Sequence, residues 1–175
     1  MAESVEYRKR MDGNKIEVTF NLNGEKTEVI IPAAYRLVDI LRKDLQLTGT
    51  KISCEIGRCG ACSVLLNDQV VNSCLIMAYQ LQNAKVETIE YISKNDLHPI
   101  QQAFLIEGGL QCGYCTPGMI VALSDLLEKN PDPTEEEVLE HLSGNLCRCT
   151  GYTGILRAVK HYKTIIVKKE NDNSI

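Results

Sequence analysis

The sequence contains no tryptophan, and only 5% of its 175 residues are aromatic. A core with so few large rings must be mainly aliphatic, and two half-sized domains would each gain stability from a bound metal cluster. No apolar run approaches the roughly 18 residues of a membrane span, and the basic triplet at 8–10 leads into no hydrophobic export segment. We therefore expect a cytoplasmic protein that does not enter a membrane.

The sequence also lacks a basic stripe. Its net charge is −4, which argues against nucleic acid as the main partner. Histidine is scarce as well, and we expect His98, His141 and His161 to be surface or capping residues rather than metal ligands. With 44% hydrophobic and 24% charged residues, the composition is that of a globular protein.

Cysteine is plentiful by contrast, with eight residues in the chain. The cytoplasm keeps thiols reduced, so these cysteines are better explained as metal ligands than as disulfides. Their even number agrees with either explanation, and the spacing of the residues has to decide.

The first set of cysteines is Cys54, Cys59 and Cys62, completed by Cys74. The spacing C-x4-C-x2-C with a later fourth cysteine is the plant-type ferredoxin pattern, in which four thiolates hold a [2Fe-2S] cluster. The loop must turn sharply to wrap the cluster, and Gly57 and Gly60 supply residues that accept a positive φ. We expect their backbone N–H groups to approach the cluster.

Alternating apolar residues on either side of the turn formers Asn23-Gly24 and Asn67-Asp68 predict two β-hairpins. A segment with helical spacing lies between the hairpins and should cross the sheet, and a short strand follows them. This order predicts a β-grasp-like ferredoxin domain over residues 15–92. The expected strands are 16–22, 27–31, 63–66, 70–72 and 86–89, and the expected helix is 37–45.

The period is helical throughout the second half, which predicts a small four-helix bundle over residues 93–167. Pro99 should begin the first helix, Thr116 should cap the second, and Thr134 with Glu137 forms a capping box for the third. The expected inward residues of the last three helices are Met119, Leu123, Leu126, Leu127, Val138, Leu139, Leu142, Ile155, Val159, Tyr162 and Ile166. The fold class is thus α+β, with flexible ends at 1–14 and 168–175.

A second set of cysteines lies where these helices begin. Cys112 and Cys115 precede the second helix, and Cys147 and Cys149 precede the fourth. Two helix N-termini would face one site, which favours thiolates because helix dipoles and free N–H groups stabilise negative charge. The C-x-C spacing is unusual for structural zinc, but the spacing alone leaves the metal open.

Three long motifs make the pattern specific. They are residues 49–51 with 54–62, then 110–119 and 144–152, and in this order they resemble the small iron-sulfur subunit of the molybdenum hydroxylases, the xanthine oxidase and xanthine dehydrogenase family. The resemblance extends over residues 15–167. It implies two [2Fe-2S] clusters, one held by Cys54, Cys59, Cys62 and Cys74 and the other by Cys112, Cys115, Cys147 and Cys149.

The same resemblance implies partners. A molybdopterin cofactor would lie in a separate large subunit near the second cluster, where Gln111 and Cys149 occupy the positions that approach the pterin. FAD would lie in a medium subunit near the first cluster, and the assembly would be a dimer of heterotrimers. This chain would relay electrons from molybdenum to FAD, with no catalytic acid, base or nucleophile of its own.

Alternatives remain at this level. A purine such as xanthine is the leading expectation for the substrate, and nicotinate, CO, aldehydes and aromatic acyl-CoA thioesters are served by similar subunits. A free ferredoxin or a zinc-stapled interaction module would be a different class of protein. We expect Tyr114 to pack beside the second cluster rather than carry electrons.

Two residues depart from the family pattern, because Ser53 stands where glycine is common and Arg58 where an acidic residue is common. Neither change removes a ligand. The cation beside Cys59 leads to the hypothesis that Arg58 raises the potential of the first cluster.

Overall fold

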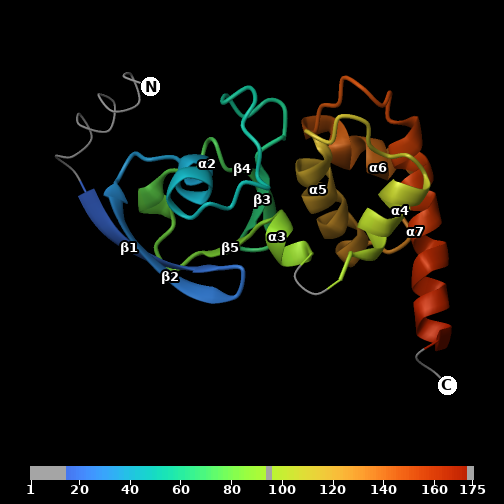
Figure 1. The fold of residues 1–175 in the computed structure, drawn as a ribbon, viewed down its shortest axis with the longest axis horizontal. Coiled ribbons are helices and arrows are strands. Elements are labelled where there is room, and N and C mark those ends of the chain that lie inside the picture. Colours follow the sequence, from blue (N-terminus) through green and yellow to red (C-terminus); the bar gives the residue numbers. More distant parts are fainter. Residues whose placement is uncertain (1–14, 94–95, 173–175) are drawn as a thin grey trace.

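The computed structural model describes residues 15–93 and 96–172, with side chains as far as Ile166 in the last helix. The predicted flexible arm at 1–14 lies outside these residues. Figure 1 shows two halves side by side, a twisted sheet with a short helix across it and a group of helices. The mixed sheet followed by helices confirms the α+β class.

The first predicted hairpin is confirmed. Strands β1 (Lys15–Leu22) and β2 (Glu25–Pro32) pair antiparallel, with Leu22 opposite Glu25. Asn23 and Gly24 between them have φ of 55° and 88°. A two-residue turn with both central residues at positive φ matches the right-handed twist of the strands it joins, so this turn fixes the register.

Three further strands complete the sheet: β3 (Ser63–Leu66), β4 (Gln69–Asn72) and β5 (Lys85–Glu87). The strand order is β2-β1-β5-β3-β4, with β5 parallel to β1 and antiparallel to β3. Asn67 and Asp68 have φ of 50° and 61°, which confirms the second predicted hairpin turn.

The predicted strand at 86–89 ends earlier than expected. Ile89 belongs to the short helix α3 (Ile89–Ile92), because the chain leaves the sheet at Thr88. The Thr88 N–H donates to Oδ1 of Asn23 at 2.9 Å, and Ile89 then packs against the helical half of the molecule. The prediction was wrong at this point because it assigned the apolar Ile89 to the core of the sheet, whereas Ile89 packs against the core of the helices.

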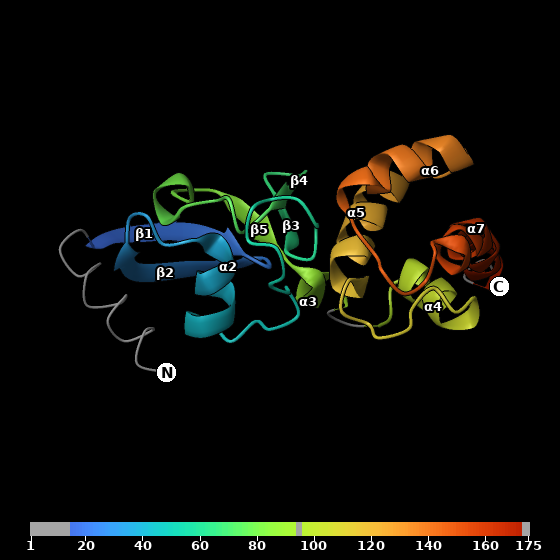
Figure 2. The ribbon, with the colours of Figure 1, turned by 90° about the horizontal axis from the view of Figure 1, so that it is seen from above.

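The helix predicted at 37–45 is present as α2 (Leu37–Asp39), continued by the π-helical turn η2 (Ile40–Asp44). The Leu45 N–H donates to the Ile40 carbonyl at 3.0 Å, which widens the last turn. Figures 1 and 2 show α2 lying across one face of the sheet, whose core residues are Val18, Phe20, Leu22, Ile31, Tyr35, Leu37, Ile40, Leu41, Val64, Ala78, Leu81 and Val86. A short 3-10 helix η3 (Ala78–Gln80) precedes β5.

The second half contains α4 (Pro99–Ile106), α5 (Thr116–Lys129), α6 (Glu135–His141) with the 3-10 turn η4 (Leu142–Gly144), and α7 (Thr153–Asp172). These helices share a second core, in which the bulkiest buried residues are Ile100, Phe104, Met119, Ile120, Leu123, Leu127, Val138, Leu142, Ile155, Val159 and Tyr162. Leu126 and Ile166 pack at its edge. The capping box of Thr134 and Glu137 is confirmed.

Three details of the helical half differ from expectation. Cys115 rather than Thr116 is the N-cap of α5. Leu139 is exposed, because one helical step from the buried Val138 turns its side chain outward. The helix α7 continues to Asp172, five residues past the predicted end of the helical domain at 167, in a stretch where lysine and glutamate are good helix formers.

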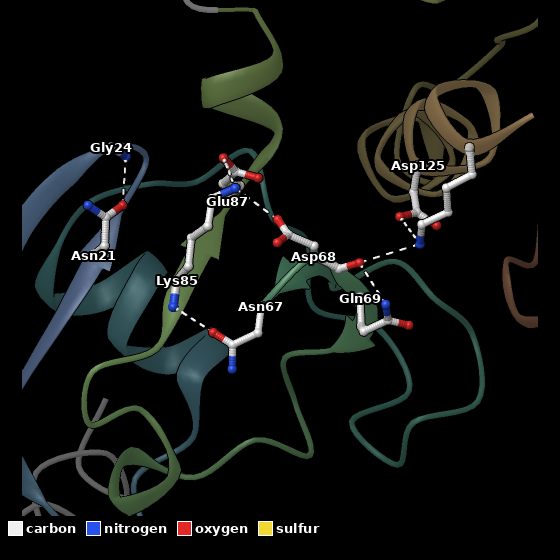
Figure 3. A network of polar contacts seen from close by, with 9 residues as sticks. Asn21, Gly24, Asn67, Asp68, Gln69, Lys85, Glu87 and Asp125 are labelled. Carbon is white, nitrogen blue, oxygen red and sulfur yellow. Dashed lines mark hydrogen bonds and ion pairs between the residues drawn. The ribbon is translucent and has the colours of Figure 1, made fainter. Parts of the chain in front are cut away.

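The two halves are joined by apolar and polar contacts. The Lys129 ammonium of α5 pairs with Asp125 at 2.6 Å and lies 3.4 Å from the backbone oxygen of Asp68, in the second hairpin turn. Figure 3 shows Asp68 and Asp125 within the same network of polar contacts. Lys85 pairs with Asp68 and Glu87 at 2.8 and 3.1 Å.

Within residues 15–93 and 96–172, no helix has both the length and the apolar character needed to cross a membrane.

Candidate metal centres

The first four thiols come together around one loop. Cys54 and Cys59 are half-buried and contact each other, and Cys62 and Cys74 are buried and do the same. Cys74 also lies close enough to Cys54 for their charges to interact. The Ser73 hydroxyl donates to the Cys62 carbonyl at 2.7 Å and thereby brings the distant Cys74 to its neighbour.

Backbone conformation in this loop agrees with the prediction for its glycines. Gly57 and Gly60 have φ of 73° and 66°. A β-carbon on Gly57 would lie 2.2 Å from Cδ1 of Leu75, and one on Gly60 would lie 2.4 Å from the Gly144 carbonyl oxygen. Both positions therefore favour glycine for conformation, and at Gly60 the neighbouring backbone also leaves no room for a β-carbon. Glu55 also has a positive φ of 59°, which the sequence did not indicate.

Backbone donors surround the exposed end of the first set. Hydrogen bonds from the backbone of Ile56 and of Arg58 lower the pKa of Cys54 to about 7, and the Arg58 N–H lies 3.3 Å from its sulfur. Burial acts in the opposite direction on Cys74 and raises its pKa to about 11. N–H groups aimed at sulfur are the surroundings that a metal-bound thiolate requires.

The second four thiols also converge, as the helix starts predict. The sulfur atoms of Cys112 and Cys149 are 3.7 Å apart, and both residues are exposed. Cys115 and Cys147 contact each other further inside. Together these contacts gather residues from the starts of α5 and α7 into one site.

The inner pair of this site has contrasting surroundings. Burial raises the pKa of Cys115 to about 12. Burial also acts to raise the pKa of Cys147, but hydrogen bonds from the Thr150 hydroxyl at 3.1 Å and the Thr150 N–H at 3.4 Å outweigh it, so that this pKa is lowered. Thr150 thus stabilises the charged form of one inner thiol.

Sequence reasoning missed the residues that hold the second loop. The Tyr152 hydroxyl accepts a hydrogen bond from the Cys147 N–H at 2.9 Å and donates one to the Asn145 carbonyl at 3.0 Å. Asn145 is buried, and its side-chain amide reaches the first cysteine loop. Both residues lie inside a recognised motif, but only the folded chain shows what they contact.

The donor set fits a pair of [2Fe-2S] clusters better than single ions. All eight cysteines are free thiols, and they group in twos as Cys54/Cys59, Cys62/Cys74, Cys112/Cys149 and Cys115/Cys147. Each iron of such a cluster takes two thiolates, whereas structural zinc takes four ligands around one ion.

The remaining candidate residues lie around these sites. Gln111 is exposed next to Cys112, and Ser53 and Arg58 are exposed in the first loop. The Tyr114 hydroxyl donates to the Ile52 carbonyl, so this side chain joins the second loop to the first. His98 caps α4, His141 lies 3.6 Å from Asp125, and His161 pairs with Glu107 at 2.7 Å.

Comparison with protein families agrees with this geometry. Residues 20–90 match the 2Fe-2S iron-sulfur cluster binding domain, and residues 88–160 match the [2Fe-2S] binding domain. The chain is therefore a protein with two [2Fe-2S]-binding domains, one for each set of four cysteines.

Individual relatives show to which family of [2Fe-2S] proteins the chain belongs. A probable xanthine dehydrogenase subunit of Bacillus subtilis is 51% identical over 144 residues, 82% of this chain and 83% of the relative. The nicotinate dehydrogenase small FeS subunit of Eubacterium barkeri is 46% identical over 149 residues, 85% of this chain and 95% of the relative. The chain belongs to the family of small iron-sulfur subunits of the molybdenum hydroxylases.

A solved structure shows the same fold inside a longer chain. The aldehyde oxidoreductase from Desulfovibrio gigas superposes with a TM-score of 0.82 at 40% identity. The match covers 88% of this chain and only 17% of that one. Both halves of the present fold therefore occur together in a much larger polypeptide.

Proposed function

We propose that this chain is the electron-transfer subunit of a multi-subunit molybdenum hydroxylase. Cys54, Cys59, Cys62 and Cys74 hold one [2Fe-2S] cluster, and Cys112, Cys115, Cys147 and Cys149 hold the other. When bound, the clusters supply one-electron carriers between a molybdopterin centre in a large subunit and FAD in a medium subunit. The protein supplies their spacing, their surroundings and the docking surfaces.

The observation that carries this proposal is the direct contact between the two cysteine loops. The Leu146 N–H, next to Cys147, donates to the Cys59 carbonyl at 2.9 Å. A free ferredoxin gives no explanation for a second cysteine site in contact with the first. A zinc-stapled module would require each set to close around a single ion, whereas the thiols group in pairs.

Exposure supports a direction for the relay. Cys112 and Cys149 lie at the surface of the second site, beside the exposed Gln111. We assign this face to the large subunit and its pterin, with Gln111 and Cys149 closest to the cofactor. The inner pair, Cys115 and Cys147, then lies on the side that leads through Leu146 to the first site.

The proposal extends to the fold, the partners and the location. We assign a β-grasp ferredoxin domain to residues 15–92 and a four-helix bundle to residues 93–167, within a dimer of heterotrimers. The assignment of all eight cysteines as metal ligands favours a cytoplasmic location, because that compartment keeps thiols reduced. A purine such as xanthine is the proposed substrate of the assembly, in line with the Bacillus subtilis relative, and nicotinate or an aldehyde is the alternative that the other relatives favour.

The test is the iron and sulfide content of the purified chain, combined with electron paramagnetic resonance after dithionite reduction. We expect four irons per chain and two distinguishable [2Fe-2S] signals. Cys59→Ser should abolish one signal and Cys112→Ser the other, because each removes a ligand from one set. Ser53→Ala is the matched control, since it changes an exposed residue of the first loop and should keep both signals.

Zinc in place of iron would overturn the proposal. One signal in the wild-type chain, lost in both cysteine variants, would show that the eight thiols serve a single cluster. The substrate assignment needs a separate measurement, namely the identity and activity of the subunits that purify with this chain.

A further inference from the structure

The first cysteine loop contains one strained residue. Glu55, directly after Cys54, has φ of 59°, which residues with a β-carbon seldom adopt. Gly57 and Gly60 of the same loop have positive φ without that cost. A strained residue keeps its conformation only where surrounding contacts hold it, so the contacts of Glu55 identify what fixes this end of the loop.

The conformation of Glu55 matters for the sulfur of Cys54. Backbone hydrogen bonds from Ile56 and Arg58 reach this sulfur, and the Arg58 N–H lies 3.3 Å from it. The peptide group that carries the Ile56 N–H is attached to Cα of Glu55. A change in the backbone angles of Glu55 therefore turns the donor away from the sulfur.

Arg36 is the residue that holds Glu55. Its Nη1 lies 2.6 Å from Oε2 of Glu55, and its Nε lies 2.7 Å from Oδ2 of Asp39. The second carboxylate oxygen of Asp39 pairs with the Lys43 ammonium at 2.7 Å. The side chain of Asp39 is only 4% exposed and that of Arg36 25%. One planar guanidinium thus joins a buried carboxylate to the cysteine loop.

The anchor of this contact is fixed relative to the other end of the cysteine set. Arg36 is the N-cap of α2, and N–H groups of α2 donate to the carbonyls of Ser73 and Ile76 at 3.2 and 2.7 Å. These two carbonyls lie on either side of Cys74 in the sequence. Arg36 therefore ties the Cys54 end of the loop to the backbone that carries the fourth cysteine.

Most exposed ion pairs stabilise a protein very little, because two long side chains lose their freedom when they pair. The pair of Lys26 and Glu28 on β2 is of that kind, since these side chains are 74% and 53% exposed. Arg36 differs because Asp39 already holds its guanidinium in place. Only Glu55 has to be ordered, so this pair can offset the strain of a positive φ.

We propose that Arg36 is a positioning residue for the first cluster: it holds Glu55, keeps the backbone donors of the loop on the Cys54 sulfur, and thereby raises the reduction potential of this site. The inference rests on the proposed function. N–H groups that donate to a cysteine sulfur stabilise the additional negative charge of the reduced state. When Arg36 releases Glu55, the strained residue relaxes, the donors turn away, and the reduced state loses this stabilisation.

Two variants at position 55 separate conformation from charge. Glu55→Ala and Glu55→Gly remove the same carboxylate and the same ion pair, but only glycine accepts the positive φ without strain. We expect the potential of the first cluster to fall below the wild-type value in Glu55→Ala but not in Glu55→Gly. The loss of an anion by itself would raise the potential in both variants. A chelator should remove iron from the first site about tenfold faster in Glu55→Ala than in Glu55→Gly, because the strain has that magnitude.

Arg36→Lys tests the proposed role at the other end of the contact. Lysine keeps the positive charge, but a single ammonium cannot join two carboxylates as the guanidinium does, and the buried Asp39 should take it. We therefore expect a lower first potential in this variant, as in Glu55→Ala. Glu28→Ala is the matched control, because it removes an exposed ion pair from β2, which lies at the opposite edge of the sheet from β4.

Redox titration of the two paramagnetic resonance signals measures both potentials in the full-length chain. The second cluster is the internal reference, and its potential should equal the wild-type value in every variant. The line shape of the first signal should change in Glu55→Ala and Arg36→Lys, whereas Glu55→Gly and Glu28→Ala should keep the wild-type line shape.

The outcomes separate this inference from the proposed function. A wild-type chain without two clusters would overturn both. Two clusters, with equal first potentials and equal iron loss in Glu55→Ala and Glu55→Gly, would overturn the inference alone. A wild-type first potential in Arg36→Lys would do the same, since charge rather than position would then explain the effect. If Arg36→Lys does not fold, the comparison of the two variants at the half-exposed position 55 decides.

Discussion

The carbonyl oxygen of Gly60 lies 2.1 Å from the point that a β-carbon on Gly118 would occupy. Gly118 is in the first turn of α5, just after the second cysteine loop, and Gly60 is in the first loop. The absence of a side chain therefore lets the helix rest directly on the backbone that carries Cys59. This close approach leads to the first prediction.

Gly118→Ala should destabilise the chain by about 1–3 kcal/mol, because the added methyl group meets backbone that cannot move aside without shifting α5. Urea unfolding of the variant and the wild type measures the difference. Gly144→Ala is the control, since a β-carbon there would meet nothing within 4 Å. Equal stability of the two alanine variants would show that the two halves are not in close contact at Gly118.

Tyr152→Phe should lower the stability by about 1–3 kcal/mol, because the Cys147 N–H and the Asn145 carbonyl both lose their partner. The second cluster should also lose iron faster to a chelator, which is followed by the decay of its resonance signal. Tyr114→Phe provides the comparison, as its hydroxyl belongs to an exposed side chain and water can replace the lost bond. Similar iron loss in both variants would contradict the role given to Tyr152.

The acid sensitivity of the helical half should depend on Glu107. A hydrogen bond from His161, followed by one from Arg157, holds the pKa of Glu107 below its ordinary value of 4.5. A depressed carboxyl pKa stabilises the fold at pH values above the unfolded pKa, and this stabilisation is lost as the pH falls through the folded pKa. The wild type should therefore melt at a higher temperature than Glu107→Gln at neutral pH.

This advantage of the wild type should disappear as the pH falls below about 4.5, the ordinary pKa of the group. Melting temperatures of both proteins across the acid range test the prediction. Glu140→Gln removes a charge from an exposed position of α6 and is the control. A difference between wild type and Glu107→Gln that persists unchanged into acid would mean that packing rather than charge explains it.

Two exposed arginines should tune the two clusters separately. Arg58 precedes Cys59, and Arg148 lies between Cys147 and Cys149. A nearby cation favours the reduced form, so Arg58→Glu should lower the midpoint potential of the first cluster and Arg148→Glu that of the second. Redox titration of each resonance signal measures the shifts.

Each charge reversal serves as the control for the other, because each should leave the distant cluster unchanged. The shifts should shrink at high ionic strength, since the Debye length falls from about 30 Å at 0.01 M salt to about 3 Å at 1 M. An unchanged first potential in Arg58→Glu at low salt would remove the hypothesis that this cation raises it.

Local chemistry explains which elements could be predicted. The turns at Asn23-Gly24 and Asn67-Asp68, the capping box of Thr134 and the glycine conformations at Gly57 and Gly60 each depend on a few neighbouring residues. The sequence contains that information, and the structure agrees with it.

The predicted elements differ from the structure where a contact between residues far apart in the sequence determines the local conformation. Ile89 leaves the predicted strand because the helical core is there to receive it, and no local pattern encodes that choice. The π-helical turn after α2 and the cap provided by Cys115 depend in the same way on how the segments pack.

The candidate sites show the same division. Spacing identified both sets of four cysteines, and the structure brings each set together. The junction of Asn145, Leu146 and Cys59 joins two loops that are far apart in the sequence, so it exists only once the halves have docked. The sequence could mark Asn145 as part of a motif but not as a link between loops.

The short helix α3 has a consequence for how this protein can be divided. By position it closes the first half, yet Ile89 and Ile92 pack against the core of the second, and the two matched domains overlap at residues 88–90. A gene fragment starting after α3 would encode helices with an uncovered apolar seam. Recombination that separated the halves would leave each with a damaged surface, which agrees with the presence of both together in the Desulfovibrio gigas polypeptide. The helix α3 therefore belongs to both halves, and no cut on either side of it leaves two intact cores.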